Sequence, residues 1–390
     1  MTKRLRAAAV AALLFPLCSL AQSHSAFPVD IIAGPPPQPF TADGKSRLVY
    51  ELHLTNFSAS PIQLLALDVF GDGADPLATY RGEALEKLLV AIGPADSAGK
   101  MRTIGGGRGV MIFLDLTLDT GTRPPAELRH RFTLSIPRKK DGGGGTIENT
   151  VNGPAVAVVQ EPVPVLRAPL RGANWIAFNA YSGGASPDHR RASQIFDGRM
   201  RIAQRFAIDW MCLGSDGRLF HGDAKSNANF YGYGAEVLAV ADGRISDLKD
   251  GLAENTGQNE EGSRHITIDN VVGNYLMLDL GQGRFALYAH LQPGSFKVRL
   301  GDKVKAGQVL ALLGNSGNSD APHLHFQLTD GNSPLGAEGV PYEIGTFTQL
   351  GVIDAPELLD TGQAWRPQPD ALSVVRRREF PVNNAVVTLP

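Results

Sequence analysis

Alternating apolar and polar residues mark short segments throughout the first half of the chain. The clearest reads Leu48-Val49-Tyr50-Glu51-Leu52-His53-Leu54-Thr55. A period of two is typical of half-buried strands, because successive side chains of a strand point to opposite faces. Similar segments cover residues 62–70, 109–118 and 128–136. Turn residues such as Gly71-Asp72-Gly73 separate these segments, so the pattern predicts an antiparallel β-sandwich domain over residues 28–165.

The second half of the chain has similar strand patterns, but here they carry side chains suited to chemistry. The segments are residues 204–210, 233–245, 284–291 and 324–328. They predict a second β domain over residues 172–351, after an extended, proline-containing linker. Residues 352–390 are expected to form a tail, and their apolar end, residues 385–389, could add a strand to either domain.

The tetrapeptide His323-Leu324-His325-Phe326 is the strongest chemical signal in the chain. On a strand, residues i and i+2 share a face, so the two imidazoles are expected side by side. Paired histidines suit a zinc site, where one ring binds the metal and the other moves protons. The preceding run, residues 314–319, lacks the Lys-Ser/Thr of a phosphate loop and predicts a tight turn instead.

Composition limits the classes of function. The chain has 390 residues, 43% of them hydrophobic, which is enough for two cores. Its 44 glycines and 26 prolines favour a turn-rich, mainly β protein. The formal net charge of -2 gives no indication of a nucleic-acid partner or of a basic membrane-binding face.

The N-terminus predicts a cleaved signal peptide over residues 1–21. Lys3, Arg4 and Arg6 precede an apolar run at residues 7–17, and Ser19-Leu20-Ala21 offers small residues for cleavage. The alternative is a membrane anchor, but the run is short for a membrane span. The mature protein is then expected to be exported to the periplasm or beyond the cell, with no transmembrane segment.

Four motifs of the second domain together resemble the lysostaphin/LytM-type zinc endopeptidases, which cut the peptides of peptidoglycan. They are the Asp242-Gly243 turn, Tyr288-Ala289-His290-Leu291, the segment from Gly301 to Gln308, and the Gly-Asn-Ser run leading to His323 and His325. The resemblance covers roughly residues 201–330. It implies a small antiparallel sheet with a groove, of the duplicated-hybrid-motif type.

The resemblance also implies roles for individual residues. Asp209 and His325 match zinc ligands, while His323 and His290 match the residues that act around the zinc-bound water and the scissile carbonyl. The family has a further ligand, a histidine, at the position of Arg205, four residues before Asp209. A guanidinium has no lone pair to offer a metal. We expect Arg205 to contact a substrate carboxylate instead.

A substitute ligand is therefore needed if the site is to hold a catalytic zinc, which normally has three protein ligands. His189 is the first candidate, because it follows a Gly/Ser/Pro-containing segment upstream of Asp209. His221 is the second. The remaining interpretation is a degenerate domain that no longer hydrolyses anything.

Two functional hypotheses follow. The first is a secreted zinc endopeptidase acting on peptidoglycan peptides, with His189, Asp209 and His325 on the metal and with His290 and His323 as catalytic residues. The second is a non-catalytic module that binds peptidoglycan or regulates a cell-wall amidase. The sequence does not specify the bond cleaved or the oligomeric state.

Overall fold

The structure is a computed structural model that describes residues 27–93, 101–119, 121–137, 145–182, 188–258, 265–368 and 372–390. Regular structure in these residues is nearly all β-strand, which confirms the predicted fold class. The predicted signal peptide at residues 1–21 lies outside the described ranges and stays a prediction. Within those ranges, no helix is both long enough and apolar enough to cross a bilayer.

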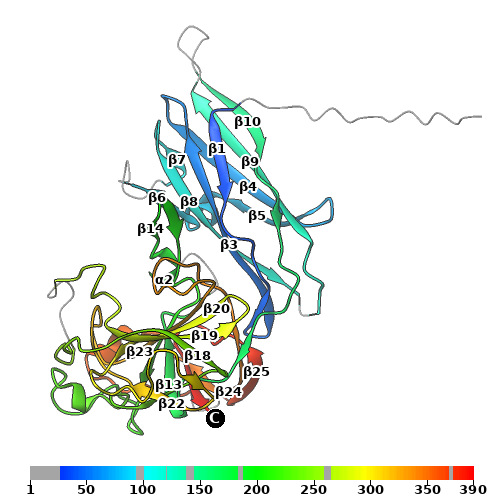
Figure 1. Ribbon diagram of the computed structural model, residues 1–390. Helices are drawn as coiled ribbons and strands as arrows, with labels where there is room; N and C mark the ends of the chain where they lie inside the picture. The colour runs from blue at the N-terminus through cyan, green and yellow to red at the C-terminus, as the bar shows by residue number, and fades with distance from the viewer. Residues whose placement is uncertain are drawn as a thin grey trace, which may run out of the picture.

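Two antiparallel sheets make up the N-terminal part (Figure 1). The first has the order β1-β3-β8-β6, with β2 beside β3; its strands are β1 (Val29–Ala33), β2 (Phe40–Ala42), β3 (Lys45–Asn56), β6 (Leu89–Ile92) and β8 (Gly109–Leu118). The second has the order β10-β9-β4-β5, with β11 beside β9 and β7 beside β4; its strands are β4 (Ile62–Phe70), β5 (Pro76–Arg81), β7 (Thr103–Ile104), β9 (Glu127–Pro137), β10 (Thr146–Asn152) and β11 (Val156–Ala157). One core cluster takes side chains from both sheets.

Strand β3 is apolar on both faces, and the two faces serve different cores. Leu48, Tyr50 and Leu52 pack into the core between the two N-terminal sheets. Val49 faces the other way and joins the core of the second half of the chain. Glu51 shares that second face by alternation and is only 1% exposed. The N-terminal part therefore turns a buried carboxylate towards the rest of the protein.

The second part is built on one large sheet with the order β12-β24-β26-β13-β16-β23-β20-β19-β18-β21, with β25 beside β24. All neighbours are antiparallel except β12 and β24. Its strands are β12 (Val165–Leu166), β13 (Gly172–Phe178), β16 (Ile208–Cys212), β18 (Gly243–Lys249), β19 (Asn274–Gly281), β20 (Arg284–Leu291), β21 (Lys303–Val304), β23 (Leu324–Thr329), β24 (Glu343–Val352), β25 (Val374–Glu379) and β26 (Ala385–Leu389).

Smaller elements complete the fold. Two strand pairs stand apart from the large sheet: β14 (Gln194–Phe196) with β15 (Arg199–Arg201), and β17 (Glu236–Leu238) with β22 (Val309–Leu312). The short helices are α1 (Gly82–Glu86), α2 (Asp188–Arg191), the 3-10 turn η2 (Asn227–Asn229) and α3 (Glu357–Asp360). The strands on either side of the Asp242-Gly243 turn do not pair with each other, since β17 pairs with β22 and β18 with β19 and β21.

The C-terminal segment is an internal part of the large sheet rather than an appended tail. Strand β26 lies between β13 and β24, with Ile176 opposite Val386 and Gln349 opposite Val387. Val386 and Val387 are fully buried. Apolar side chains on both faces suit an internal strand, because both faces of the sheet are covered there.

The two parts of the chain are packed against each other. Phe40 of β2 lies edge-on to Tyr181 and Phe206, with ring centroids 5.2 Å and 5.3 Å away. Met111 and Phe113 of β8 form a second cluster with Ile202, just after β15. Helix α2 lies at this junction, below the N-terminal sheets in Figure 1.

Candidate metal centre

Asp209 and His325 face each other across two neighbouring strands of the large sheet. Asp209 of β16 is the direct antiparallel partner of His325 of β23, so both side chains lie on the same face. The Nδ1 atom of His325 is 2.8 Å from Oδ1 of Asp209. The register of the sheet thus places the two ligands predicted from the family pattern in contact.

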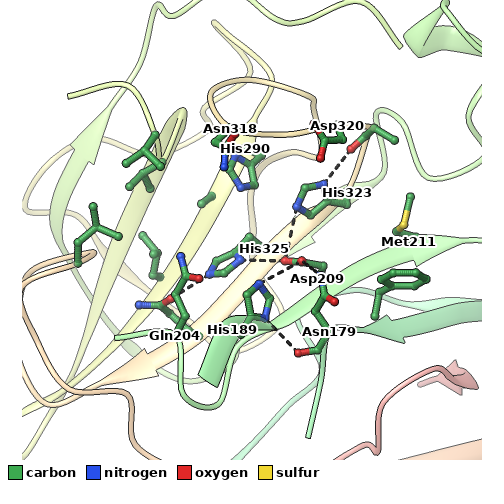
Figure 2. Close-up of a pocket in the computed structure, with 18 of the residues that line it drawn as sticks. Asn179, His189, Gln204, Asp209, Met211, His290, Asn318, Asp320, His323 and His325 are labelled. Carbon is green, nitrogen blue, oxygen red and sulfur yellow. Dashed lines mark hydrogen bonds and ion pairs between the residues drawn. The ribbon is translucent and has the colours of Figure 1, made fainter. Parts of the chain in front are cut away.

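His189 reaches the same carboxylate from outside the sheet. It belongs to α2, and its Nε2 atom lies 3.1 Å from Oδ2 of Asp209 (Figure 2). The ring is 8% exposed and stands edge-on to His325, with centroids 4.9 Å apart. One nitrogen of each histidine and one oxygen of Asp209 all lie within 4.8 Å of one another. This set has the spacing and the donor types of a metal site.

His323 and His290 lie next to this cluster. The Nε2 atom of His323 is 3.5 Å from Oδ1 of Asp209. His290 is the next-to-last residue of β20 and has a positive φ of 62°. Its ring centroid is 4.7 Å from that of His323 and 5.8 Å from that of His325. A positive φ is uncommon for a residue other than glycine, and such residues gather at functional sites.

The Gly-Asn-Ser turn holds both of these rings, which gives the run a role in the site. The Nδ1–H of His290 donates to the carbonyl oxygen of Ser316 at 2.7 Å. The Nδ1–H of His323 donates to the carbonyl oxygen of Ala321 at 2.8 Å, with the hydroxyl of Ser319 3.1 Å away. The turn therefore orients the rings, as ligand-orienting partners do around metal sites.

Hydrogen bonds fix which ring nitrogen of each histidine faces the carboxylate of Asp209. A carbonyl oxygen only accepts, so the Nδ1–H of His189 donates to the oxygen of Asn179 at 3.1 Å, and Nε2 is the nitrogen that faces Asp209. His325 is reversed, because its Nε2–H donates to Oε1 of Gln327 at 2.9 Å. The amide nitrogen of Gln327 donates to the oxygen of Pro334, which fixes the amide in this orientation. His325 therefore offers Nδ1 to the site.

Asp209 dominates the electrostatics of the cluster. Burial alone would raise the pKa of Asp209, but the charges of His189 and His323 outweigh burial and hold this pKa well below its ordinary value. Burial is the largest single influence on His189 and His323 and lowers the pKa of each, but the charge of Asp209 and the hydrogen bonds to Asp209 and to a backbone oxygen together outweigh it and raise both. Burial and the charges of His323 and His325 lower the pKa of His290 well below its ordinary value.

These residues line one cavity of about 430 Å³. His189, Asp209, His290, His323 and His325 all face it (Figure 2). Its wall also includes apolar side chains and two further acids: Phe178, Met211, Val271, Val272, Leu335, Asp320 and Asp360. The cavity is thus lined by a few polar groups together with apolar side chains, which is usual for a small-ligand or substrate site.

The expected role of Arg205 in substrate binding is not supported by its position. Strand β16 begins only at Ile208, so Arg205 lies in a preceding turn and does not share the face of Asp209. Arg205 is 7% exposed, and its guanidinium binds Glu51, Glu338 and the carbonyl oxygen of Gly339 at 2.9–3.0 Å. It does not line the cavity. These buried acceptors already bind the guanidinium, so its position does not favour contact with a substrate carboxylate.

His221 also lies away from the centre. It is exposed, stands edge-on to Tyr231, and does not line the cavity. Two residues of the site had not been predicted, Asn179 and Gln327. Gln327 could have been found, because it lies two residues after His325 on the same strand face. Asn179 gave no signal, since only the fold brings its side chain to within 2.9 Å of Asp209.

A protein-family model matches part of this domain. Residues 229–336 match "Peptidase family M23". The match includes His290, His323 and His325 and begins after Asp209. The segment that carries His189 lies outside it.

Curated relatives match a similar stretch. The glycyl-glycine endopeptidase ALE-1 of Staphylococcus capitis is 37% identical over 98 residues, which are 25% of this chain and 22% of the relative. The peptidoglycan DD-endopeptidase ShyA of Vibrio cholerae is 37% identical over 65 residues, 17% of this chain and 15% of the relative. The murein hydrolase activator EnvC of Escherichia coli is 35% identical over 95 residues, 24% of this chain and 18% of the relative. The chain thus spans about a fifth of the length of these relatives.

Solved structures match as well. The catalytic domain of lysostaphin from Staphylococcus simulans is 24% identical, with a TM-score of 0.21, and the match covers 32% of this chain and 86% of that domain.

Proposed function

We propose, from the match of residues 229–336 to peptidase family M23, that the chain is a zinc-dependent hydrolase of peptide bonds in cell-wall peptidoglycan. The observation that carries the proposal is the cluster of His189, Asp209 and His325, whose ligand atoms lie within 4.8 Å of one another. Two relatives that match this chain are named as endopeptidases, one of them of peptidoglycan. Export, as the N-terminal pattern predicts, would bring the protein to such a substrate.

The donor set fits zinc. Two imidazole nitrogens and one carboxylate oxygen are common ligands of a catalytic zinc, which keeps a further position for water or substrate. A hydrogen bond at the ring nitrogen that does not face Asp209 orients each ring. His189 binds the oxygen of Asn179, and His325 binds Gln327. Such partners hold the ligand nitrogen towards the metal. In this assignment His189 takes the place of the histidine that the family has at position 205.

Bound zinc would supply the acidity of a water molecule and polarise the scissile carbonyl. The protein's own contribution is proton transfer and orientation. Because its Nδ1–H is bound to Ala321, neutral His323 turns a basic Nε2 towards the cavity, next to Asp209. It is placed to take a proton from an attacking water and to return it to the leaving amine.

His290 is placed to act on the substrate carbonyl. Its Nδ1–H is bound to Ser316, so Nε2 donates a hydrogen bond to a developing oxyanion only when the ring is doubly protonated. In the neutral ring, which its lowered pKa favours, Nε2 accepts a proton instead. The activity of His290→Ala across pH therefore distinguishes an oxyanion-stabilising role from a base role.

The test is the metal content and activity of the purified protein. We expect about one zinc per chain and hydrolysis of isolated peptidoglycan. His189→Ala and His325→Ala should both lose most of the metal, whereas His221→Ala, an exposed histidine outside the cavity, should keep it. Wild-type protein that neither contains zinc nor takes it up would refute the enzyme assignment.

The alternative, a non-catalytic regulatory module, rested on the missing ligand at Arg205. The position of His189 weakens that argument, because this residue of α2 lies next to Asp209 and offers the missing ligand. A binding groove also has no physical need for His290 and His323 around the same carboxylate.

A further inference from the structure

We propose that Glu51, in the N-terminal sheets, is a positioning residue for the metal ligand His189. The proposal rests on the proposed function, because it takes His189 as a zinc ligand. In this proposal, the N-terminal part of the chain helps to hold a metal ligand in position. Glu51 touches neither the cavity nor the metal ligands, so it acts through Arg190 and Arg205.

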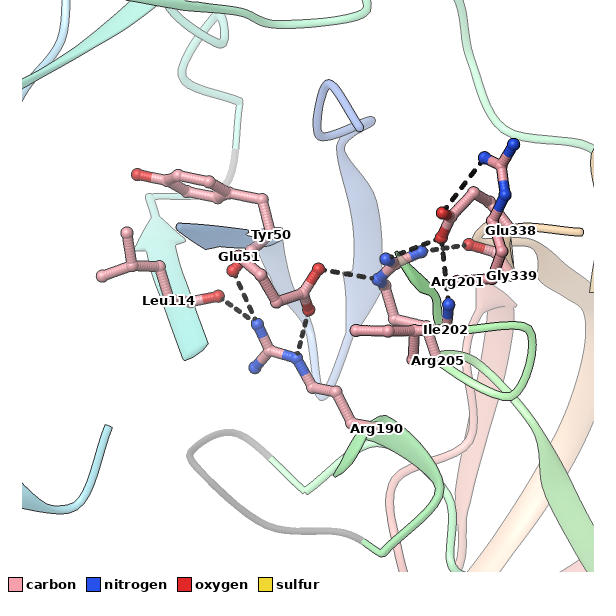
Figure 3. Close-up of polar contacts among 9 residues, drawn as sticks. All are labelled: Tyr50, Glu51, Leu114, Arg190, Arg201, Ile202, Arg205, Glu338 and Gly339. Atoms are coloured by element: carbon pink, nitrogen blue, oxygen red, sulfur yellow. Dashed lines mark hydrogen bonds and ion pairs between the residues drawn. The ribbon is translucent and has the colours of Figure 1, made fainter. Parts of the chain in front are cut away.

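The first step is the hold on Arg190, the residue after His189. Its Nε donates to Oε1 of Glu51 at 3.0 Å (Figure 3). Its Nη2 donates to the carbonyl oxygens of Tyr50 and Leu114, at 2.9 Å and 2.7 Å. Tyr50 and Leu114 are paired neighbours on β3 and β8, so Arg190 is bound to the face of the N-terminal sheet. With 3% exposure, the side chain has little freedom to move.

The start of the same segment is anchored on the same sheet. Tyr181 donates its hydroxyl proton to Oδ2 of Asp115 on β8 at 2.7 Å. Asp115 follows Leu114, one of the two carbonyl partners of Arg190. The described residues on both sides of the connection into α2 are therefore attached to β8. His189 is carried by a segment whose position is set by the N-terminal sheets.

The second oxygen of Glu51 reaches the other side of the metal site. Oε2 accepts from Nε of Arg205 at 3.0 Å, and Arg205 also binds Glu338 at 2.9 Å. Arg205 lies four residues before Asp209, in the turn that leads into β16. One carboxylate thus joins the residue next to His189 to the segment that leads to Asp209, which fixes the separation of the two ligands.

Helix α2 needs such support because it cannot hold His189 by itself. It has only 4 residues, which is too short for stability from its own hydrogen bonds. A ligand must nevertheless be held to within about 0.5 Å for a metal site to be effective. The contacts of Arg190 with the N-terminal sheet supply this rigidity from outside the helix.

The test substitutes Glu51→Gln in the full chain and measures the dissociation constant for zinc by competition with a chelator. We expect it to rise about 10- to 100-fold, as it does when an orienting partner of a metal ligand is lost. The visible spectrum of the cobalt-substituted protein should change as well, because the geometry of the ligands changes. A purely structural role for Glu51 would leave the affinity and the spectrum of the folded protein unchanged, and that result would overturn the proposal.

The matched control is Asp68→Asn. Asp68 is also a buried carboxylate of the N-terminal sheets that binds two arginines, Arg81 at 3.5 Å and Arg131 at 3.0 Å. None of these residues lines the cavity or contacts α2 in the described structure. Asp68→Asn should therefore lower stability and leave the zinc affinity as in the wild type. Equal loss of zinc in both variants would mean that general destabilisation, not positioning, is the cause.

Two further variants keep the outcomes separate. If Glu51→Gln does not fold, the variant Arg190→Lys tests the proposal in its place. A lysine keeps the charge but cannot bind Glu51 and two carbonyls in one plane. Unchanged zinc affinity in this variant overturns the proposal. If His189→Ala binds zinc as tightly as the wild type, the ligand assignment itself fails. If His189→Ala loses zinc while folded Glu51→Gln retains it, the proposed function stands and only the role of Glu51 falls.

Discussion

Replacing Arg205 by histidine restores the family's sequence pattern, yet we expect it to damage the protein without adding a metal ligand. Arg205 makes hydrogen bonds of 2.9–3.0 Å to Glu51, Glu338 and Gly339. An imidazole is too short to reach all three acceptors. Two carboxylates that are 1% and 5% exposed would each lose a charged partner.

The magnitude follows from the burial of these groups. Removing one partner of a buried ion pair costs about 3–5 kcal/mol, because the remaining charge stays desolvated. We expect Arg205→His to lower the free energy of unfolding by about this amount, measured by urea denaturation. Arg201→His is the control, since Arg201 also binds Glu338, at 3.4 Å, with a side chain that is 31% exposed. A partly exposed pair is worth at most about 1 kcal/mol.

The zinc content of Arg205→His should stay at about one per chain, held through His189. The decisive protein is the double variant Arg205→His with His189→Ala. We expect it to bind zinc as weakly as His189→Ala alone, because residue 205 lies in a turn before β16 and off the face of Asp209. Recovery of zinc binding in the double variant would refute this reasoning and show that position 205 still has access to the site.

Three further predictions concern catalysis, pH and the sheet. His323→Ala and His290→Ala should each keep zinc but lose about 10²-fold or more in peptidoglycan hydrolysis, measured by dye release; loss of zinc in either variant would assign that ring to the metal. Burial raises the pKa of Glu51, but its two arginine partners together outweigh burial and lower this pKa. The ionised Glu51 carboxylate therefore stabilises the fold fully above the unfolded-state pKa of about 4.3. This stabilisation is lost as the pH falls through the pKa of Glu51 in the folded state. Urea midpoints measured from pH 6 downwards (about one unit apart) should accordingly fall less steeply for Glu51→Gln than for the wild type. Leu389→Ala, at 2% exposure in β26, should cost about 2–5 kcal/mol in the same assay, whereas Leu372→Ala, at 87% exposure, should stay within about 0.5 kcal/mol of the wild type.

Local patterns in the sequence were enough to predict the mainly β fold and much of the cluster. The alternation at residues 48–55 corresponds to β3, and the spacing of His323 and His325 does place both rings beside Asp209. These inferences succeeded because the period of a strand decides which residues share a face. His189 could be named as a candidate, but only the fold shows that α2 brings it to 3.1 Å from the carboxylate.

The environment of Arg205 could not be read from the sequence. Its partner Glu51 lies 154 residues away, on a strand whose other face packs into a different core. Nothing in the pattern at residues 48–55 distinguishes a glutamate that faces solvent from one that faces a second domain. The substrate-binding role was inferred only from the ability of a guanidinium to bind a carboxylate. In the folded protein, two buried carboxylates already bind this guanidinium.

The internal position of β26 also bears on when the site can first form during synthesis. Strand β13 pairs with β26 on one side and with β16, which carries Asp209, on the other. Residues 385–389 must therefore leave the ribosome before the sheet around the site can close. Pairing between segments so distant in the sequence is slow to form. A nascent chain would carry every side chain of the site for some time without the finished scaffold, so the site can form only after synthesis has passed residue 389.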